Sequence, residues 1–140
     1  MLKTKLSAAL ALAVGLSAAV VSAGAAAAGI TGKTNLVCAS VDVVGCTNGN
    51  CLQGQAHTFD MPNFMFIDVK RKLVHATDES DKEVSSPIRN FEVTENTIIL
   101  QGFENHRGWT LGVDRKTGKM TMSATGADVS FMVFGNCTQR

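Results

Sequence analysis

The sequence predicts an all-β protein of about eight antiparallel strands, arranged as a meander and closed, or nearly closed, into a small disulfide-bonded β-barrel. Short segments of alternating apolar and polar residues recur along the chain, at the spacing typical of barrels and sandwiches. After the N-terminal region, no segment shows the apolar period of a helix. A two-sheet sandwich is the alternative, because it uses the same alternation.

The first residues have the features of a secretory signal peptide. Lys3 and Lys5 form a basic start, residues 6–21 form an apolar run, and small residues suited to cleavage follow. The run is close to the lower length limit of a membrane span, so an uncleaved N-terminal anchor is the alternative. We expect residues 1–28 to be a cleaved signal peptide and residues 29–140 to be one domain. The mature protein would then be periplasmic or secreted, with no stable membrane span.

The strands are predicted in the following order. The first covers residues 35–44 and places alternate side chains on two faces, with Leu36, Cys38, Ser40 and Asp42 on one and Val37, Ala39, Val41 and Val43 on the other. Residues 45–55 are predicted to form a loop rich in glycine and asparagine, and residues 77–86 a solvated polar loop. The remaining strands are predicted at residues 64–69, 73–76, 88–94, 97–103, 109–113, 120–124 and 129–134.

The last hairpin has a register that its turn and its apolar pattern both support. If Arg115–Gly118 form the loop, Val113 faces Met120 and Leu111 faces Met122. Trp109 then faces Ala124, so every apolar side chain of the pair lies on one face.

The chain contains four cysteines, an even number that indicates two disulfides in an exported protein. We favour Cys46–Cys51, because the turn-forming residues between them bring the two cysteines together. Cys38 then pairs with Cys137, which joins the first strand to the last, as a closed barrel allows. A zinc site or a catalytic thiol is the alternative, but the spacings match no paired Cys-x-x-Cys pattern.

The charge balance excludes one class of partner. Loss of Lys3 and Lys5 with the signal peptide changes the formal charge from +1 to −1. A near-neutral chain without a basic stripe is not typical of a nucleic-acid-binding protein. No cofactor is expected.

Three histidines, His57, His75 and His106, are the candidates for catalysis. The sequence has no Gly-x-Ser-x-Gly nucleophile motif and no glycine-rich phosphate loop. A hydrolase that uses His106 or His75 is one alternative function. It requires a cleft where one of these side chains lies within hydrogen-bond reach of a carboxylate.

Methionines offer a second alternative function. Met120 and Met122 lie opposite Trp109 in the predicted hairpin, with His106 nearby, and thioether ligands favour Cu(I). A second sparse set consists of His57, Met61 and Met65. These residue types resemble those of the small periplasmic copper chaperones, β-barrels that bind Cu(I) with one His, two Met and a covering Trp. The register argument favours core packing for Met120 and Met122, which share a face with Leu111 and Val113.

Several short segments carry a wider resemblance: Asn35–Ala39, Asp42–Cys46, Cys51, Gly108–Leu111, Val113–Gly118 and Phe134–Cys137. They are similar to segments of small, uncharacterised secreted proteins of Gram-negative bacteria. The resemblance implies export and a fold of this kind, and no known activity comes with it. The function that the sequence favours is a non-enzymatic periplasmic module that binds a protein or a small apolar ligand through loops or the barrel mouth.

Overall fold

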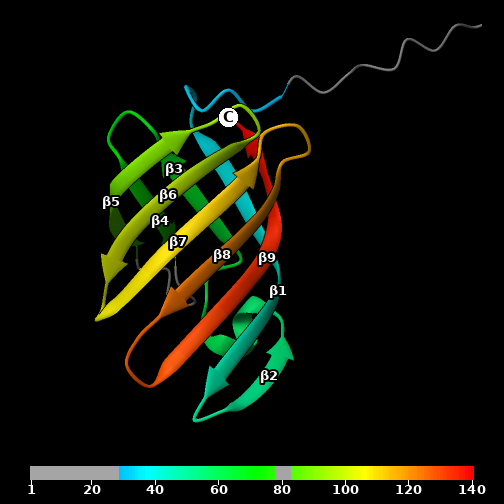
Figure 1. The fold of residues 1–140 in the computed structure, drawn as a ribbon, viewed down its shortest axis with the longest axis vertical. Coiled ribbons are helices and arrows are strands. Elements are labelled where there is room, and N and C mark those ends of the chain that lie inside the picture. Colours follow the sequence, from blue (N-terminus) through cyan, green and yellow to red (C-terminus); the bar gives the residue numbers. More distant parts are fainter. Residues whose placement is uncertain (1–28, 78–82) are drawn as a thin grey trace, which may run out of the picture.

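The computed structural model describes residues 29–77 and 83–140, so the predicted signal peptide lies outside the described residues. The described residues form nine β-strands and one short 3-10 helix, η1 (Figure 1). No helix among them is long and apolar enough to cross a membrane. The elements are β1 (Leu36–Thr47), β2 (Asn50–Gly54), η1 (Ala56–Phe59), β3 (Phe64–Asp68), β4 (Leu73–Thr77), β5 (Glu83–Val93), β6 (Thr97–Glu104), β7 (Arg107–Asp114), β8 (Lys119–Thr125) and β9 (Val129–Gln139).

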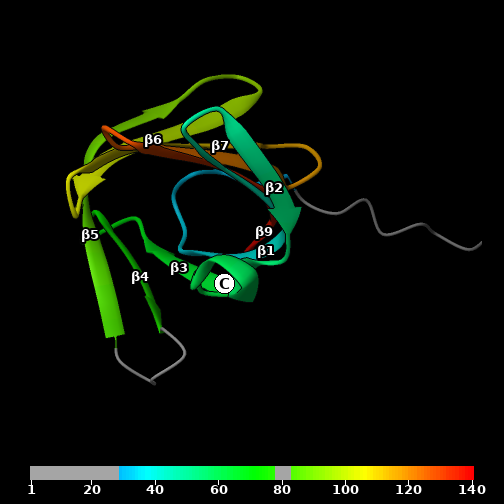
Figure 2. The same cartoon turned by 90° about the horizontal axis from the view of Figure 1, so that it is seen from below.

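Eight of the strands close into an antiparallel barrel, seen end-on in Figure 2. β3 to β9 pair in sequence order, β3 also pairs with β1, and β9 returns to β1 along its whole length. The prediction of a barrel is therefore confirmed over the sandwich. Side chains that alternate inward fill one core, whose most deeply buried members include Leu36, Val43, Ile67, Ile98, Leu100 and Val113.

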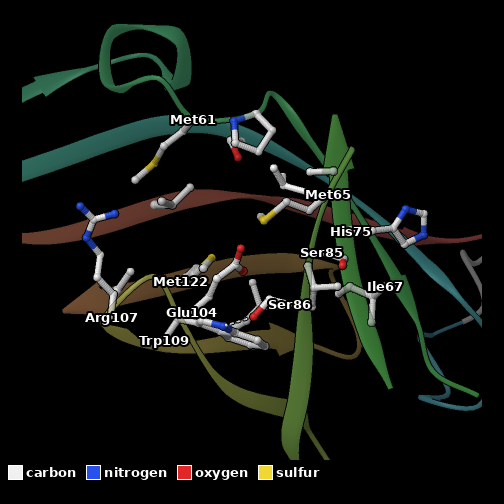
Figure 3. Close-up of a pocket in the computed structure, with 18 of the residues that line it drawn as sticks. Met61, Met65, Ile67, His75, Ser85, Ser86, Glu104, Arg107, Trp109 and Met122 are labelled. Atoms are coloured by element: carbon white, nitrogen blue, oxygen red, sulfur yellow. Dashed lines mark hydrogen bonds between the residues drawn. The ribbon is translucent and has the colours of Figure 1, made fainter. Parts of the chain in front are cut away.

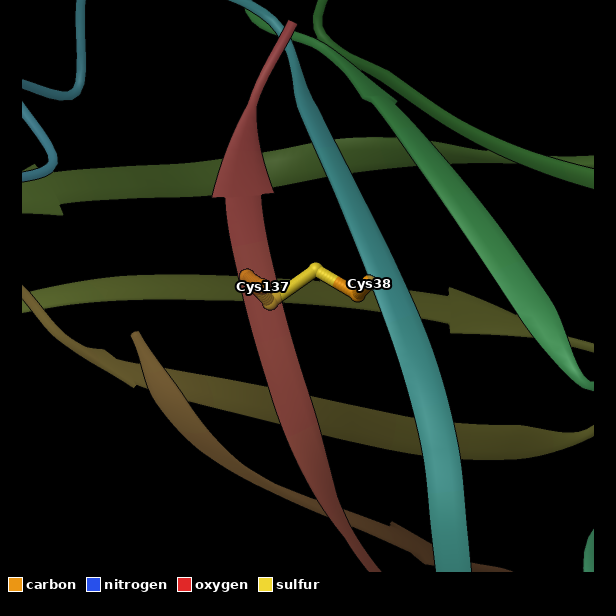
Figure 4. Close-up of a disulfide and its surroundings, with 2 residues drawn as sticks. All are labelled: Cys38 and Cys137. Atoms are coloured by element: carbon orange, nitrogen blue, oxygen red, sulfur yellow. A yellow bond between two sulfur atoms is a disulfide. The ribbon is translucent and has the colours of Figure 1, made fainter. Parts of the chain in front are cut away.

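The structure contains two disulfides, with the pairing that the sequence favours. Cys38 and Cys137 lie directly opposite each other on β1 and β9, with their Cα atoms 4.0 Å apart (Figure 4). Cys46 and Cys51 form the second bridge, with a Cα separation of 4.1 Å. Both bonds are compatible with a protein that folds in an oxidising environment outside the cytoplasm.

The predicted faces of the first strand are wrong beyond Ser40. The pairing of β1 with β9 shifts between Ser40 and Asp42, because Val41 is an extra residue in a β-bulge. A bulge reverses the inward and outward alternation after it. Val43 is consequently fully buried on the same side as Leu36 and Cys38, and Asp42 is exposed.

The predicted loops at residues 45–55 and 77–86 are also partly wrong. β1 runs on to Thr47 and pairs with β2 across a two-residue turn, Asn48-Gly49, with φ values of 51° and 80°. Two successive positive φ angles are typical of the tight hairpin turn that Asn-Gly favours. In the second loop, residues 83–86 belong to β5, and residues 78–82 lie outside the described residues.

The predicted register of the last hairpin is confirmed. Val113 pairs with Met120, Leu111 with Met122 and Trp109 with Ala124. The Oδ1 atom of Asp114 accepts hydrogen bonds from the backbone N–H groups of Lys116 and Thr117, which holds the turn in shape.

Candidate functional site

A cavity of about 230 Å³ lies inside the barrel, at the end that carries the β6–β7 turn (Figure 3). Its wall is mainly apolar and includes Met65, Ile67, Leu111, Met122, Ala124 and Val133. These side chains come from β3, β7, β8 and β9, at positions where period-two alternation directs them inward. An eight-stranded barrel has an interior that its side chains just fill or that holds one small ligand.

The path of β5 explains why this end of the barrel is not filled. The first half of β5 pairs with β4, and the second half pairs with β6. The register shifts between Ile88 and Asn90, and the last pair of β5 with β6 is Ile88 with Gly102. Beyond that pair β5 and β6 no longer pair with each other, although Ser86 still pairs with Val74 on β4 and Glu104 with Arg107 on β7. Ser86 and Glu104 border the cavity on the two sides of this gap in the pairing.

Trp109 forms one wall of the cavity and is held by a specific hydrogen bond. Its indole Nε1 donates to the Oγ of Ser86 on β5 at 2.8 Å, and both side chains are buried. The indole also covers Gly102, its cross-strand neighbour, where a Cβ atom would overlap the ring. These two contacts fix the orientation of the only tryptophan in the chain.

Charged side chains lie at the mouth of the cavity. Glu104 and Arg107 are opposite each other at the ends of β6 and β7, on the inward face of the hairpin. The Glu104 carboxylate points into the cavity, toward Met65 and Met122, whereas Arg107 rises at its edge (Figure 3). The Arg107 guanidinium lies over the ring of Phe131, 5.7 Å from its centroid. The cavity therefore combines an apolar interior with one carboxylate that points inward.

The methionine sets expected for copper are rearranged by the fold. Met122 and Trp109 line the cavity, but Met120 is buried elsewhere in the core, and His106 is exposed in the β6–β7 turn. Two members of the second set, Met61 and Met65, line the same cavity as Met122. All three sulfur-bearing side chains extend into it (Figure 3).

One of the three histidines lies near a carboxylate. The Nδ1 atom of His75 lies 3.7 Å from Glu83 Oε1, which is longer than a hydrogen bond. His75 is among the residues that line the cavity, but its ring stacks on Phe66 and is directed away from the interior (Figure 3). His57 and His106 are exposed. Among residues 29–77 and 83–140, no three His, Cys, Asp or Glu side chains group as metal ligands do. The hydrolase alternative stays a prediction.

Two residues of the site, Ser86 and Glu104, were not predicted from sequence. The sequence pattern could have indicated Glu104, because this residue continues the alternation of Ile98, Leu100 and Gly102 on the inward face of β6. Ser86 has no such signal, since it lies in a segment whose polar composition is typical of a loop.

Comparison with known protein families found no matching family, and comparison with curated proteins found no matching relative. The resemblance to secreted proteins of Gram-negative bacteria stays a prediction. The chemistry of the cavity is thus the basis for assigning a function.

Proposed function

We propose that this protein is a non-enzymatic binding module of the periplasm that holds a small apolar ligand inside one end of its barrel. The observation that carries the proposal is the apolar cavity beside Trp109, whose indole is fixed by Ser86. A largely preformed apolar cavity with few polar groups is the usual form of a small-molecule site. The predicted signal peptide and the two disulfides support the compartment.

The size of the cavity limits the ligand. An apolar protein cavity of about 150 Å³ binds benzene, and this one measures about 230 Å³. It suits one substituted ring or an alkyl chain of about six carbons. Larger ligands would project through the mouth, past Glu104 and Arg107.

The sole tryptophan provides the test. A ligand in the cavity contacts the wall that Trp109 forms, so binding is expected to shift or quench its fluorescence. The protein is titrated with a series of straight-chain alcohols from butan-1-ol to decan-1-ol. We expect saturable binding that tightens with chain length up to about six carbons and then levels off. Further methylenes would extend beyond the apolar lining of the cavity and gain no contact with it. A response that is linear and unsaturable for every alcohol contradicts the proposal.

Two leucine variants on β8 separate cavity binding from surface binding. Ala124 lines the cavity, whereas Thr121 on the same strand is exposed on the outer face. Ala124→Leu is expected to weaken the binding of hexan-1-ol, because the added methylenes occupy the ligand's space. Thr121→Leu is expected to leave binding unchanged. If both variants bind hexan-1-ol like the wild type, the ligand does not occupy this cavity.

A second candidate function is the binding of Cu(I). It is favoured by the three thioethers of Met61, Met65 and Met122, which extend into one cavity, because thioethers select this ion. Titration with Ag(I), a soft ion of the same charge, is expected to quench Trp109 in the wild type. Replacement of Met65 and Met122 by leucine is expected to abolish the quenching. Quenching that persists in that variant contradicts the candidate.

A further inference from the structure

The inward face of β6 ends in a carboxylate, where a barrel interior would ordinarily carry an apolar side chain. Ile98 and Leu100 are fully buried, Gly102 lies under Trp109, and Glu104 follows on the same face. Glu104 is half-buried and lines the cavity, whereas the neighbouring Phe103 points outward and is exposed. Strand alternation thus places a carboxylate inside the mouth of an apolar cavity, with Arg107 at the edge of the same mouth.

The nearest cationic side chain on the hairpin is directed elsewhere. Arg107 is the cross-strand partner of Glu104, but its guanidinium lies over Phe131 on β9. Its stem packs beside Gly126, at whose Cα a Cβ atom would lie 3.2 Å from Arg107 Cγ. Among the described residues, no salt bridge involves Glu104. Its carboxylate is available to a ligand.

The surroundings of the carboxylate favour a positive charge. Trp109 supplies the aromatic wall that attracts cations, and Met65 and Met122 supply polarisable thioethers. A carboxylate that is partly removed from water gains from a cationic hydrogen-bond donor, and a neutral or anionic ligand head supplies no such charge.

We propose that the ligand class of this cavity is a small organic amine, whose ammonium group pairs with Glu104 and whose apolar part enters the barrel beside Trp109. The inference rests on the proposed function, since it names the chemistry of the ligand in the same cavity. It differs from that function in requiring a positive charge at the mouth. The ammonium donates to the Glu104 carboxylate, and no bond is formed or broken.

Three probes with the same alkyl chain test the charge requirement. Hexylammonium, hexan-1-ol and hexanoate are titrated against the protein near neutral pH, with Trp109 fluorescence as the readout. We expect hexylammonium to bind about tenfold more tightly than hexan-1-ol, the gain of a charge-assisted hydrogen bond, and hexanoate to bind most weakly. The preference for hexylammonium is expected to fall as salt is added.

A matched pair of variants locates the charge. Glu104→Gln keeps the shape of the side chain and removes its charge, so hexylammonium and hexan-1-ol should bind this variant with similar affinity. Glu92→Gln makes the same change at an exposed position on β5 and should leave the preference intact. The inference is overturned if hexan-1-ol and hexylammonium bind wild type equally, if the preference survives Glu104→Gln, or if hexanoate binds best. If none of the three probes binds, the proposed function itself fails together with the inference.

Discussion

The indole Nε1 of Trp109 on β7 donates a 2.8 Å hydrogen bond to the Oγ of Ser86 on β5, and both side chains are buried. The two strands are not neighbours in the sheet, because β6 lies between them. The bond therefore links β5 to β7 past the end of the β5–β6 pairing, in the lining of the cavity.

Removing this bond should destabilise the barrel. Ser86→Ala leaves the indole N–H buried without an acceptor, which typically costs about 1–3 kcal/mol of unfolding free energy. Urea unfolding followed by circular dichroism measures the loss. Ser85→Ala changes the exposed neighbour of Ser86 and should alter stability by less than about 0.5 kcal/mol. Equal losses in the two variants would show that the hydrogen bond contributes nothing.

A methyl group at Gly102 should displace Trp109. The indole lies where a Cβ atom of residue 102 would sit, and overpacking of this kind costs about 1–3 kcal/mol. Gly102→Ala should also change the emission of Trp109, because the ring must move. Gly108 has no atom within 4 Å of its would-be Cβ, so Gly108→Ala on the same hairpin is the control and should be neutral. An unchanged emission spectrum in Gly102→Ala contradicts this packing.

The two disulfides should differ in their contribution to stability. Cys38–Cys137 closes a loop with a sequence separation of 99, and Cys46–Cys51 one of 5. In the chain-entropy model, loops of these lengths correspond to about 4–5 and about 2 kcal/mol. Each pair is replaced by serines, and unfolding in urea is compared. A larger loss from the Cys46/Cys51 pair would contradict the role of Cys38–Cys137 as the bond that holds the barrel closed.

The turn at Asp114 should make stability depend on pH. The backbone N–H of Thr117, its hydroxyl and the N–H of Lys116 donate to the carboxylate, and these bonds hold the pKa of Asp114 below its usual value of 3.8. A pKa that is lower in the folded state stabilises the protein above pH 3.8, and this stabilisation is lost as the pH falls through the folded value. Asp114→Asn lacks the charge. The stability difference between wild type and this variant should therefore shrink at acid pH, and a difference that is constant with pH contradicts the assignment.

The parts of the fold that could be predicted are those where two independent signals agree. Apolar alternation and turn chemistry together specify the hairpin of Trp109 to Ala124, and its register is correct. Closure of the barrel follows from the meander and from the cysteines near its two ends. In contrast, Val41 carries no signal of a bulge, because a β-branched apolar residue fits a regular strand equally well.

The candidate site was harder to predict, because it depends on where two neighbouring strands stop pairing. The cavity borders the place where β5 changes partner near Arg89, so that the end of β6 pairs with β7 but not with β5. Nothing local to Ser86 or Glu104 encodes that change. The convergence of Met61, Met65 and Met122 likewise requires the path of the chain through η1 into β3, which has no periodic pattern.

A methyl NMR titration tests most directly the central proposal that a small apolar ligand binds inside the barrel. Methionine methyl groups are labelled with ¹³C, and hexan-1-ol is added to saturation. If the cavity holds the ligand, the signals of Met61, Met65 and Met122 shift together with one affinity, because all three side chains line it. Met132, exposed on β9, is the internal reference and should not move. A spectrum in which those three signals stay in place, or in which only Met132 shifts, would contradict ligand binding inside the barrel.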